Sequence, residues 1–382
     1  MRFLSVLRIS LGRTRVRSAG FLIARALSNT TLQSERYPFG IAFDIDGVIL
    51  RGRTPIGGSL AAVRKLYSDS GTLQIPFLFL TNGGGIPESR RAQELTRILG
   101  VNILPLQVVQ GHSPFKNLLN KFENELIVAV GKGEPATVMS EYGFKKALSI
   151  DEYSSCFNDI DPLAQFKPWI TKQPFLESNC PEVIQTKYNV LSDKVKAAFV
   201  VSDPVDWSRD IQVLCDILRS GGLPGKGVGH HQPDLYFAAD DLEYQAAFPC
   251  ERLGMGAFRI ALESIYNRIN DSPLKYTSYG KPNPFVFKNA EDILKQVQSY
   301  ILGKGEGEGE IHQLETVYMV GDNPLVDIKG AQQTGKPWFS ILTRTGVFKE
   351  KGNHAQFPAD LVVDTVEEAV DYILMEESSK KA

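Results

Sequence analysis

The stretch Phe43-Asp44-Ile45-Asp46-Gly47-Val48 decides how this chain of 382 residues is interpreted. Its first residue, Phe43, ends the apolar run at residues 41–43, which is typical of a buried β-strand. Residues two apart in an extended chain point to the same side, so the carboxylates of Asp44 and Asp46 are expected to face the same way. Neighbouring carboxylates repel each other unless protons or a cation such as Mg²⁺ neutralise them. The alternative is one aspartate that caps a turn and one that faces solvent.

A glycine-rich stretch, Thr81-Asn82-Gly83-Gly84-Gly85, follows a second apolar run at residues 77–80. Glycine-rich backbone can present N–H groups to a phosphate, and the hydroxyl of Thr81 and the amide of Asn82 add further hydrogen-bonding groups. The alternative is an ordinary loop that precedes a helix predicted over residues 87–99.

Two later stretches carry further charged side chains. Lys281 stands before Pro282 on a restricted backbone, and its positive charge suits a phosphate. In residues 321–327 (GDNPLVD), Asp322 would complete a metal site and Asp327 would anchor the loop or the lysine. The alternatives are a solvated lysine and a Gly-Asp turn in which Asp327 caps the following helix.

Apolar runs alternate with helical segments over most of the chain, which predicts parallel sheets covered on both faces. Such sheets bind ligands at the carboxyl ends of their strands, so the four stretches are expected to converge. We predict an α/β fold: a doubly wound, Rossmann-like parallel sheet from residues 37–113 and 277–382, with a large inserted α/β domain at residues 114–276. The predicted strands that follow the first are 77–80, 126–130, 197–201, 317–320, 339–342 and 361–363.

The first 36 residues are rich in arginine and serine, and the first acidic residue is Glu35. Leu4, Leu7 and Leu11 recur at helical spacing, and this amphipathic, acid-free pattern is typical of a mitochondrial transit peptide. A secretory signal would need an unbroken apolar stretch, and arginine interrupts each candidate here. The remaining alternative is a disordered basic tail.

Composition narrows the classes of function. The formal charge of −2 gives no electrostatic reason to expect nucleic acid as a partner. The four cysteines form no CxxC pair, which argues against a zinc site or a disulfide framework. No apolar run approaches the roughly 20 residues of a transmembrane helix, so no transmembrane segment is expected.

Taken together, the order DxDG, TN, GKP and GDNxxxD resembles the motif set of the haloacid dehalogenase (HAD) superfamily. The large insertion between the second and third motifs resembles its class IIA members, the NagD-like and p-nitrophenyl phosphatase-like enzymes. The TNGGG stretch and the GMGAF stretch at residues 254–258 are most similar to a mitochondrial branch of that class. The resemblance extends from about residue 41 to the end of the chain and implies a HAD core with an inserted cap domain.

The resemblance also implies roles for individual residues. Asp44 would be the nucleophile, and Asp46 would protonate the leaving oxygen and then accept a proton from water. Mg²⁺ would be held by Asp44, the backbone carbonyl of Asp46 and Asp322. The phosphoryl group would be bound by Thr81, Asn82, Gly83 and Lys281, with Asn323 and Asp327 in support. Relatives usually have a second asparagine where this chain has Gly83, which puts the orientation of the substrate in doubt.

In class IIA the cap closes over the site and selects the substrate. The residues expected to contact the substrate from the cap or its hinge are Asp240 and Asp241, which follow a predicted strand, together with His112 and the turn at residues 254–256. A packed or solvated role is the more usual one for a histidine such as His112. A homodimer through the cap is the expected assembly.

The sequence therefore predicts a Mg²⁺-dependent phosphatase in mitochondria that acts through an aspartyl-phosphate on a small phosphorylated metabolite or a lipid-derived phosphate. A dehalogenase needs no acid for a leaving oxygen and no metal, so Asp46 favours phosphoryl chemistry. The alternative is a weakly active or non-enzymatic member that binds a partner protein in mitochondria.

Overall fold

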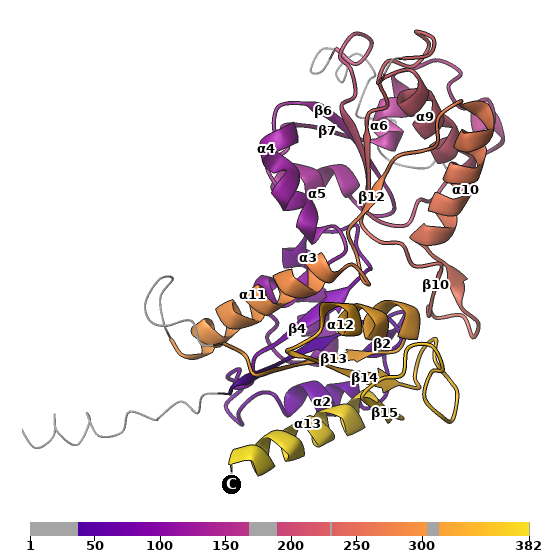
Figure 1. Ribbon diagram of the computed structural model, residues 1–382. Helices are drawn as coiled ribbons and strands as arrows, with labels where there is room; N and C mark the ends of the chain where they lie inside the picture. Colours follow the sequence, from indigo (N-terminus) through magenta and orange to yellow (C-terminus); the bar gives the residue numbers. More distant parts are fainter. Residues whose placement is uncertain (1–36, 168–188, 230, 304–312, 382) are drawn as a thin grey trace, which may run out of the picture. The chain divides into compact units, whose positions relative to one another are not determined.

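The computed structural model describes residues 37–167, 189–229, 231–303 and 313–381 (Figure 1). Two parallel sheets with surrounding helices make up these residues, so the predicted α/β fold with an inserted cap is confirmed. The predicted transit peptide, residues 1–36, lies outside the described residues. None of the described helices combines the length and apolar character that crossing a bilayer requires.

The core sheet has six parallel strands in the order β15-β14-β13-β1-β4-β5. The chain runs from β1 to β4 and β5 on one side, and the later strands add on the other side. Ligands of open α/β sheets bind where the strand order reverses in this way, at the carboxyl ends of β1 and β13. The strands are β1 (Phe39–Phe43), β4 (Phe77–Thr81), β5 (Val108–Gln110), β13 (Thr316–Gly321), β14 (Trp338–Thr343) and β15 (Leu361–Val363).

Helices cover both faces of the core sheet because successive side chains of a strand point to opposite sides. Ile41 and Phe43 pack with apolar residues of α2, α3 and α13, whereas Ala42 packs with those of α11 and α12. Burial on both faces explains why these strands are uninterrupted apolar runs in the sequence. The helices are α2 (Ser59–Arg64), α3 (Glu88–Leu99), α11 (Pro284–Ile301), α12 (Lys329–Thr334) and α13 (Val366–Lys381).

The cap contains a second parallel sheet, of five strands in the order β12-β9-β8-β6-β7. β12 (Thr277–Ser278) pairs with β9 immediately after the boundary predicted at residue 276. The domain boundaries stay predictions. The other strands are β6 (Leu126–Val130), β7 (Lys146–Ser149), β8 (Ala197–Val200) and β9 (Asp234–Phe237), and the helices are α4 (Leu119–Phe122), α5 (Pro135–Glu141), α6 (Ile150–Ser155), α9 (Trp207–Arg219) and α10 (Met255–Ile269).

Two short hairpins and several short helical turns complete the described elements. The hairpin of β2 (Leu50–Arg51) and β3 (Thr54–Pro55) follows the DIDG motif, and that of β10 (Glu243–Tyr244) and β11 (Arg252–Leu253) belongs to the cap. The short turns are η1 (Pro105–Gln107), η2 (Ser113–Leu118), η3 (Ala164–Phe166) and η4 (Pro324–Ile328).

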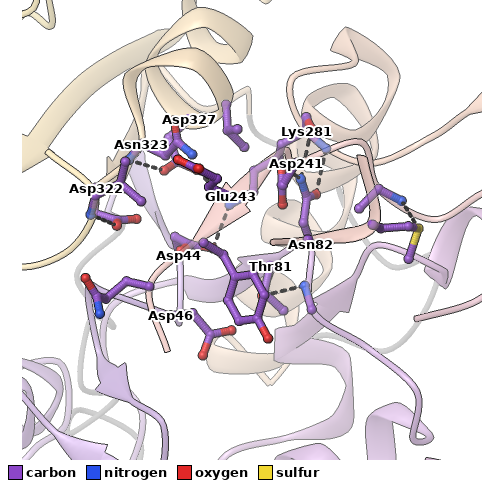
Figure 2. Close-up of a pocket in the computed structure, with 18 of the residues that line it drawn as sticks. Asp44, Asp46, Thr81, Asn82, Asp241, Glu243, Lys281, Asp322, Asn323 and Asp327 are labelled. Carbon is purple, nitrogen blue, oxygen red and sulfur yellow. Dashed lines mark hydrogen bonds and ion pairs between the residues drawn. The ribbon is translucent and has the colours of Figure 1, made fainter. Parts of the chain in front are cut away.

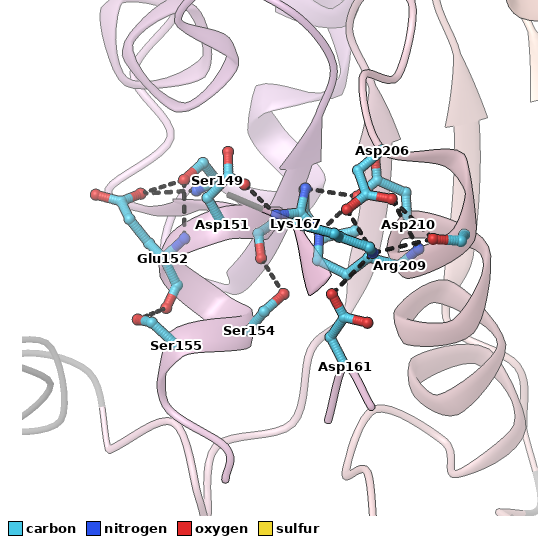
Figure 3. Close-up of polar contacts among 12 residues, drawn as sticks. Ser149, Asp151, Glu152, Ser154, Ser155, Asp161, Lys167, Asp206, Arg209 and Asp210 are labelled. Atoms are coloured by element: carbon cyan, nitrogen blue, oxygen red, sulfur yellow. Dashed lines mark hydrogen bonds and ion pairs between the residues drawn. The ribbon is translucent and has the colours of Figure 1, made fainter. Parts of the chain in front are cut away.

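A buried lysine holds one part of the cap together (Figure 3). The Lys167 ammonium lies 2.7 Å from a carboxylate oxygen of Asp206, 2.9 Å from one of Asp161 and 3.0 Å from the Ser208 hydroxyl. The Asp206 carboxylate also accepts the Arg209 N–H at the start of α9. One lysine therefore neutralises two carboxylates and fixes residues 161–167 against the amino-terminal end of α9.

Replacing Lys167 with methionine should lower the free energy of unfolding by about 2–4 kcal/mol, because it leaves two carboxylates buried without a cation. Urea unfolding at neutral pH measures the change. Lys145→Met is the control, since Lys145 pairs with Glu123 on the surface of the same cap and its loss should change stability by less than about 1 kcal/mol. Equal effects of the two substitutions would contradict this account.

Candidate functional site

The sequence motifs lie at the carboxyl ends of three adjacent core strands. Asp44 follows β1, Thr81 ends β4 and Asp322 follows β13. These residues, with Asp46, Asn82, Gly83, Lys281, Asn323 and Asp327, line one pocket (Figure 2). The structure therefore brings the four motifs together.

Three of the aspartates form a tight, buried cluster. Carboxylate oxygens of Asp44, Asp322 and Asp327 lie within 4.8 Å of one another. The Val347 N–H donates to Asp322 at 2.7 Å, and the Asn323 N–H donates to Asp327 at 3.0 Å. These contacts fix the two carboxylates that the later motif supplies.

Two glycines make room for the Asp322 carboxylate. Gly47 has φ +93°, a conformation that favours glycine, and a Cβ atom there would overlap the Asp322 carboxylate. A Cβ atom at Gly346 would overlap the same carboxylate. The DIDG turn and the loop after β14 thus need glycine on both sides of Asp322.

Lys281 is the buried cation of the cluster, with only 1% of its surface exposed. Its ammonium lies 2.7 Å from a carboxylate oxygen of Asp44 and 2.7 Å from one of Asp327. The Asn82 amide holds the lysine backbone at both ends, since it donates to the Lys281 carbonyl at 2.9 Å and accepts the Lys281 N–H at 2.8 Å. The alternatives of a solvated lysine and a helix-capping Asp327 do not match these contacts.

Burial has the largest influence on the pKa values of the side chains in this cluster. It raises the pKa of Asp44 to about 7, although Lys281 opposes the shift. It also raises the pKa of Asp322 well above its ordinary value, and the neighbouring carboxylates of Asp44 and Asp327 add to the shift. Burial alone would lower the pKa of Lys281, but Asp327 and Asp44 raise it above its ordinary value. The single ammonium of Lys281 therefore lies among three buried carboxylates, and a bound cation would balance the remaining negative charge.

The donor set fits a hard divalent cation. Its ligands would all be carboxylate or carbonyl oxygens, which Mg²⁺ prefers, and they converge on a small volume. The carboxylates of Asp44 and Asp322 each have one hydrogen-bonding partner, the Lys281 ammonium and the Val347 N–H, whereas Asp327 has two, Lys281 and the Asn323 N–H. This division agrees with the predicted supporting role of Asp327.

The Thr81-Asn82-Gly83 stretch lies beside Asp46. The Gly83 N–H donates to the Thr81 hydroxyl at 3.0 Å. A Cβ atom at Gly83 would lie 3.4 Å from Asp46 Oδ2 and 3.2 Å from Thr81 Oγ1. Burial raises the pKa of Asp46, with Arg91 and Lys132 acting in the opposite direction. Asp46 thus faces a part of the pocket that no side chain of residue 83 occupies.

The two aspartates predicted to contact the substrate diverge. The Asp241 carboxylate lines the pocket and accepts the Asn82 amide at 2.8 Å, which links cap and core, and burial raises its pKa to about 8. The Asp240 carboxylate instead pairs with Arg259 and is not among the lining residues.

His112 is packed rather than placed in the pocket. Its ring is buried, with Nδ1 2.7 Å from the Tyr142 hydroxyl, and burial lowers its pKa to about 4. Met255, from the predicted turn at residues 254–256, does line the pocket. The cap adds residues that the sequence interpretation missed, namely Lys132, Asp203, Glu243, Tyr244 and Gln245.

Family models match both parts of the core. A model described as haloacid dehalogenase-like hydrolase matches residues 41–145, and one described as HAD-hydrolase-like matches residues 278–369. The first match begins within β1 and the second begins within β12, just before Lys281. All the motif residues of the core therefore fall inside the matched ranges.

Two curated relatives are similar over most of the chain. A Saccharomyces cerevisiae protein named mitochondrial hydrolase is 31% identical over 88% of this chain and 96% of its own length. A Schizosaccharomyces pombe protein, named cardiolipin synthase (CMP-forming) / mitochondrial hydrolase fusion protein, is 32% identical over 90% of this chain. This chain spans 55% of that fusion protein.

Solved structures share the fold. A 4-nitrophenylphosphatase from Thermotoga maritima is 18% identical with a TM-score of 0.53, over 88% of this chain and 98% of its own. A glycerol phosphate phosphatase from Mycobacterium tuberculosis, solved with magnesium, is 16% identical with a TM-score of 0.53, over 88% of this chain and 77% of its own. The resemblance predicted from the motifs is confirmed, and the chain belongs to the haloacid dehalogenase-like hydrolases.

Proposed function

We propose that this hydrolase is a Mg²⁺-dependent phosphatase that acts on small phosphorylated metabolites or lipid-derived phosphates in mitochondria. The observation that carries the proposal is the ion pairing of one buried lysine, Lys281, with both Asp44 and Asp327 in a cluster that Asp322 completes. In this proposal the arrangement would supply a nucleophile, a cation for phosphoryl oxygens and oxygen ligands for a metal. The names of the two fungal relatives and the arginine-rich start of the chain support the mitochondrial location.

The proposed reaction has two steps. Asp44 attacks phosphorus, an Asp44 O–P bond forms and the bond from phosphorus to the leaving oxygen breaks. Burial raises the pKa of Asp46, which favours the protonated form that donates a proton to that oxygen. Asp46 then accepts a proton from water as the water attacks the aspartyl-phosphate and releases Asp44.

The remaining residues bind and orient. Lys281 would contact phosphoryl oxygens while Asp327 and Asn82 hold it in position. Thr81 and the backbone of Asn82 and Gly83 would complete the phosphoryl site. Bound by Asp44, the Asp46 carbonyl and Asp322, Mg²⁺ would favour the ionised form of Asp44 and offset its repulsion by an anionic phosphate. A homodimer through the cap stays a prediction.

Phosphate release by the full chain tests the proposal. With millimolar Mg²⁺ we expect release from a panel of phosphate monoesters, and with chelator we expect a loss of at least about 10²-fold, because several kcal/mol of charge stabilisation is removed. Asp322→Asn should raise the Mg²⁺ concentration for half-maximal rate by about 10-fold or more. The control is Asp371→Asn, a surface aspartate paired with Lys65.

Two outcomes would overturn the proposal. A rate that is the same with Mg²⁺ and with chelator would rule out the metal-dependent mechanism. No release from any monoester by folded, Mg²⁺-supplied protein would instead favour the alternative of a member that binds a partner protein.

A further inference from the structure

Three cap side chains line the same pocket as Asp44 and Asp46 but take no part in the chemistry proposed above: Lys132, Asp203 and Tyr244. Lys132 follows β6 and Asp203 follows β8, at the carboxyl ends of adjacent parallel strands. Tyr244 lies on β10. The cap sheet thus presents charged residues toward the pocket from the same kind of position that supplies the catalytic residues in the core.

Their mutual contacts are specific. The Lys132 ammonium lies 2.7 Å from Asp203 Oδ2, and the Lys132 N–H donates to the Asp203 carbonyl at 2.9 Å. The same ammonium lies 5.7 Å from the centre of the Tyr244 ring. A cation, an anion and an aromatic wall are therefore grouped on one side of the pocket.

The loop that carries Lys132 is fixed against the core. The Ser202 hydroxyl donates to the Lys132 carbonyl at 2.7 Å, and the Glu134 N–H donates to the Gly85 carbonyl at 2.7 Å. A Cβ atom at Gly133 would overlap that Gly85 carbonyl. Because Gly85 ends the glycine-rich stretch after β4, the backbone of Lys132 is held next to the proposed phosphoryl site.

The group lies on the leaving-group side of that site. Lys132, Asp203 and Tyr244 line the same pocket as Asp46 and Gly83, and the loop of Lys132 packs on Gly85, two residues after Gly83. Asp46 is the proposed donor to the leaving oxygen, and Gly83 leaves the space beside it without a side chain. A leaving group protonated by Asp46 would therefore extend toward Lys132, Asp203 and Tyr244.

The charges in this region select against a negative leaving group. Asp203 and Glu243 line it beside the ammonium of Lys132, which already pairs with Asp203. A carboxylate on the leaving group would be repelled by Asp203 and Glu243, and the neighbouring Lys132 ammonium is already paired. A hydroxyl can instead donate to Asp203 and accept from Lys132 or the Tyr244 hydroxyl.

We infer that Lys132, Asp203 and Tyr244 form a leaving-group subsite that favours phosphate monoesters of small uncharged polyols over those that carry a carboxylate. This inference rests on the proposed phosphatase function, since it assigns the part of the substrate that departs when phosphorus is attacked. A hydrogen-bonding site of this kind discriminates strongly between substrates, because a substrate without matching groups leaves the polar groups of the site unpaired.

The test uses the full chain with Mg²⁺ and three probes: glycerol 3-phosphate, 3-phosphoglycerate and p-nitrophenyl phosphate. Wild type should show kcat/KM at least about 10-fold higher for glycerol 3-phosphate than for 3-phosphoglycerate. Lys132→Met should lower kcat/KM for glycerol 3-phosphate by about 10–100-fold and that for p-nitrophenyl phosphate by less than about 3-fold. Asp203→Asn should lower the ratio of kcat/KM for glycerol 3-phosphate to kcat/KM for 3-phosphoglycerate.

Lys121→Met and Asp234→Asn are matched controls, because they remove another lysine–aspartate pair of the cap that does not line the pocket. They should leave the substrate ratios unchanged. An equal loss on all three probes in Lys132→Met, or a wild-type preference for 3-phosphoglycerate, would overturn the subsite and leave the phosphatase function standing. No release from any probe by wild type would contradict the phosphatase function, and the subsite with it.

Discussion

Replacing Asp44 with asparagine should reduce kcat for phosphate release by about 10⁴-fold or more, as expected for loss of a nucleophile. An amide cannot form the aspartyl-phosphate, so only binding and electrostatic stabilisation would remain. The rate of phosphate release from the full chain at saturating Mg²⁺ and substrate measures the effect. Borohydride reduction of the quenched wild-type reaction, followed by mass spectrometry, should locate the trapped aspartyl-phosphate at Asp44.

Asp327→Asn is the matched control for that substitution. Asp327 lies at the same 2.7 Å from the Lys281 ammonium as Asp44 does and is also buried, with 1% of its surface exposed compared with 8% for Asp44. In the proposed mechanism Asp327 does not form the covalent bond, so we expect Asp327→Asn to lower kcat by about 10–10²-fold, typical of a residue that orients another. Similar losses in the two variants would contradict the assignment of Asp44 as the nucleophile.

The stability of the Asp44→Asn variant separates catalysis from folding. Burial raises the pKa of Asp44 to about 7, so the folded state retains a proton that the unfolded chain loses near pH 4. Asp44 therefore makes its full contribution to the free energy of unfolding at low pH, and this contribution is lost as pH rises toward 7. Above that pH the metal-free protein must bury an ionised Asp44, which is unfavourable. Asp44→Asn should therefore be at least as stable as wild type in chelator at pH 8.

The core part of the site could be predicted because its residues obey a positional rule. Asp44, Thr81 and Asp322 end or follow parallel strands whose apolar character is visible in the sequence, and such strand ends meet at one edge of the sheet. Burial of the strands on both faces makes these runs continuous. Identifying the strands was thus enough to bring distant residues together.

The cap part followed the same rule and was still missed. Lys132 and Asp203 also stand just beyond strands, but the glycines around Lys132 and the proline after Asp203 are typical of any surface loop. The packing of the Lys132 loop against Gly85 holds these residues at the pocket. That contact joins two separate sheets, and no local pattern in the sequence encodes it.

Asp240 and Asp241 show a second limit of sequence patterns. Adjacent residues of an extended segment point to opposite sides, so at most one of them could reach the pocket. Asp241 reaches Asn82, whereas Asp240 turns to Arg259 on α10. Choosing between them requires knowing which side of the segment faces the core, and that depends on how the cap is placed.

Lys281→Met should have the largest effect on stability of any single change in the pocket. It would leave the Asp44 and Asp327 carboxylates buried without their shared cation, a loss of about 3–5 kcal/mol in the free energy of unfolding. Urea unfolding in chelator measures this loss. The same variant should lose at least about 10²-fold in kcat with Mg²⁺ present, because the charge that develops on the phosphoryl oxygens loses a fixed partner.

Lys65→Met provides the matched comparison. Lys65 also pairs with two carboxylates, at 3.1 Å from Glu367 and 2.6 Å from Asp371, but on the surface. Solvent screens these charges, so its replacement should cost less than about 1 kcal/mol. If Lys281→Met cost no more than Lys65→Met, burial would not be what gives the Lys281 pairs their strength.

The double variant Lys281→Met, Asp327→Asn then distinguishes a lost ion pair from a lost side-chain packing contact. If uncompensated charge causes the instability, neutralising Asp327 should recover about 1–3 kcal/mol of the loss, since both members of one pair are then absent. If poor packing of the methionine is the cause, the losses in the free energy of unfolding from the two substitutions should add or exceed their sum. The double variant could recover stability without recovering activity. That result would assign two roles to the Lys281 ammonium: it balances charge in the folded protein, and it binds the phosphoryl group.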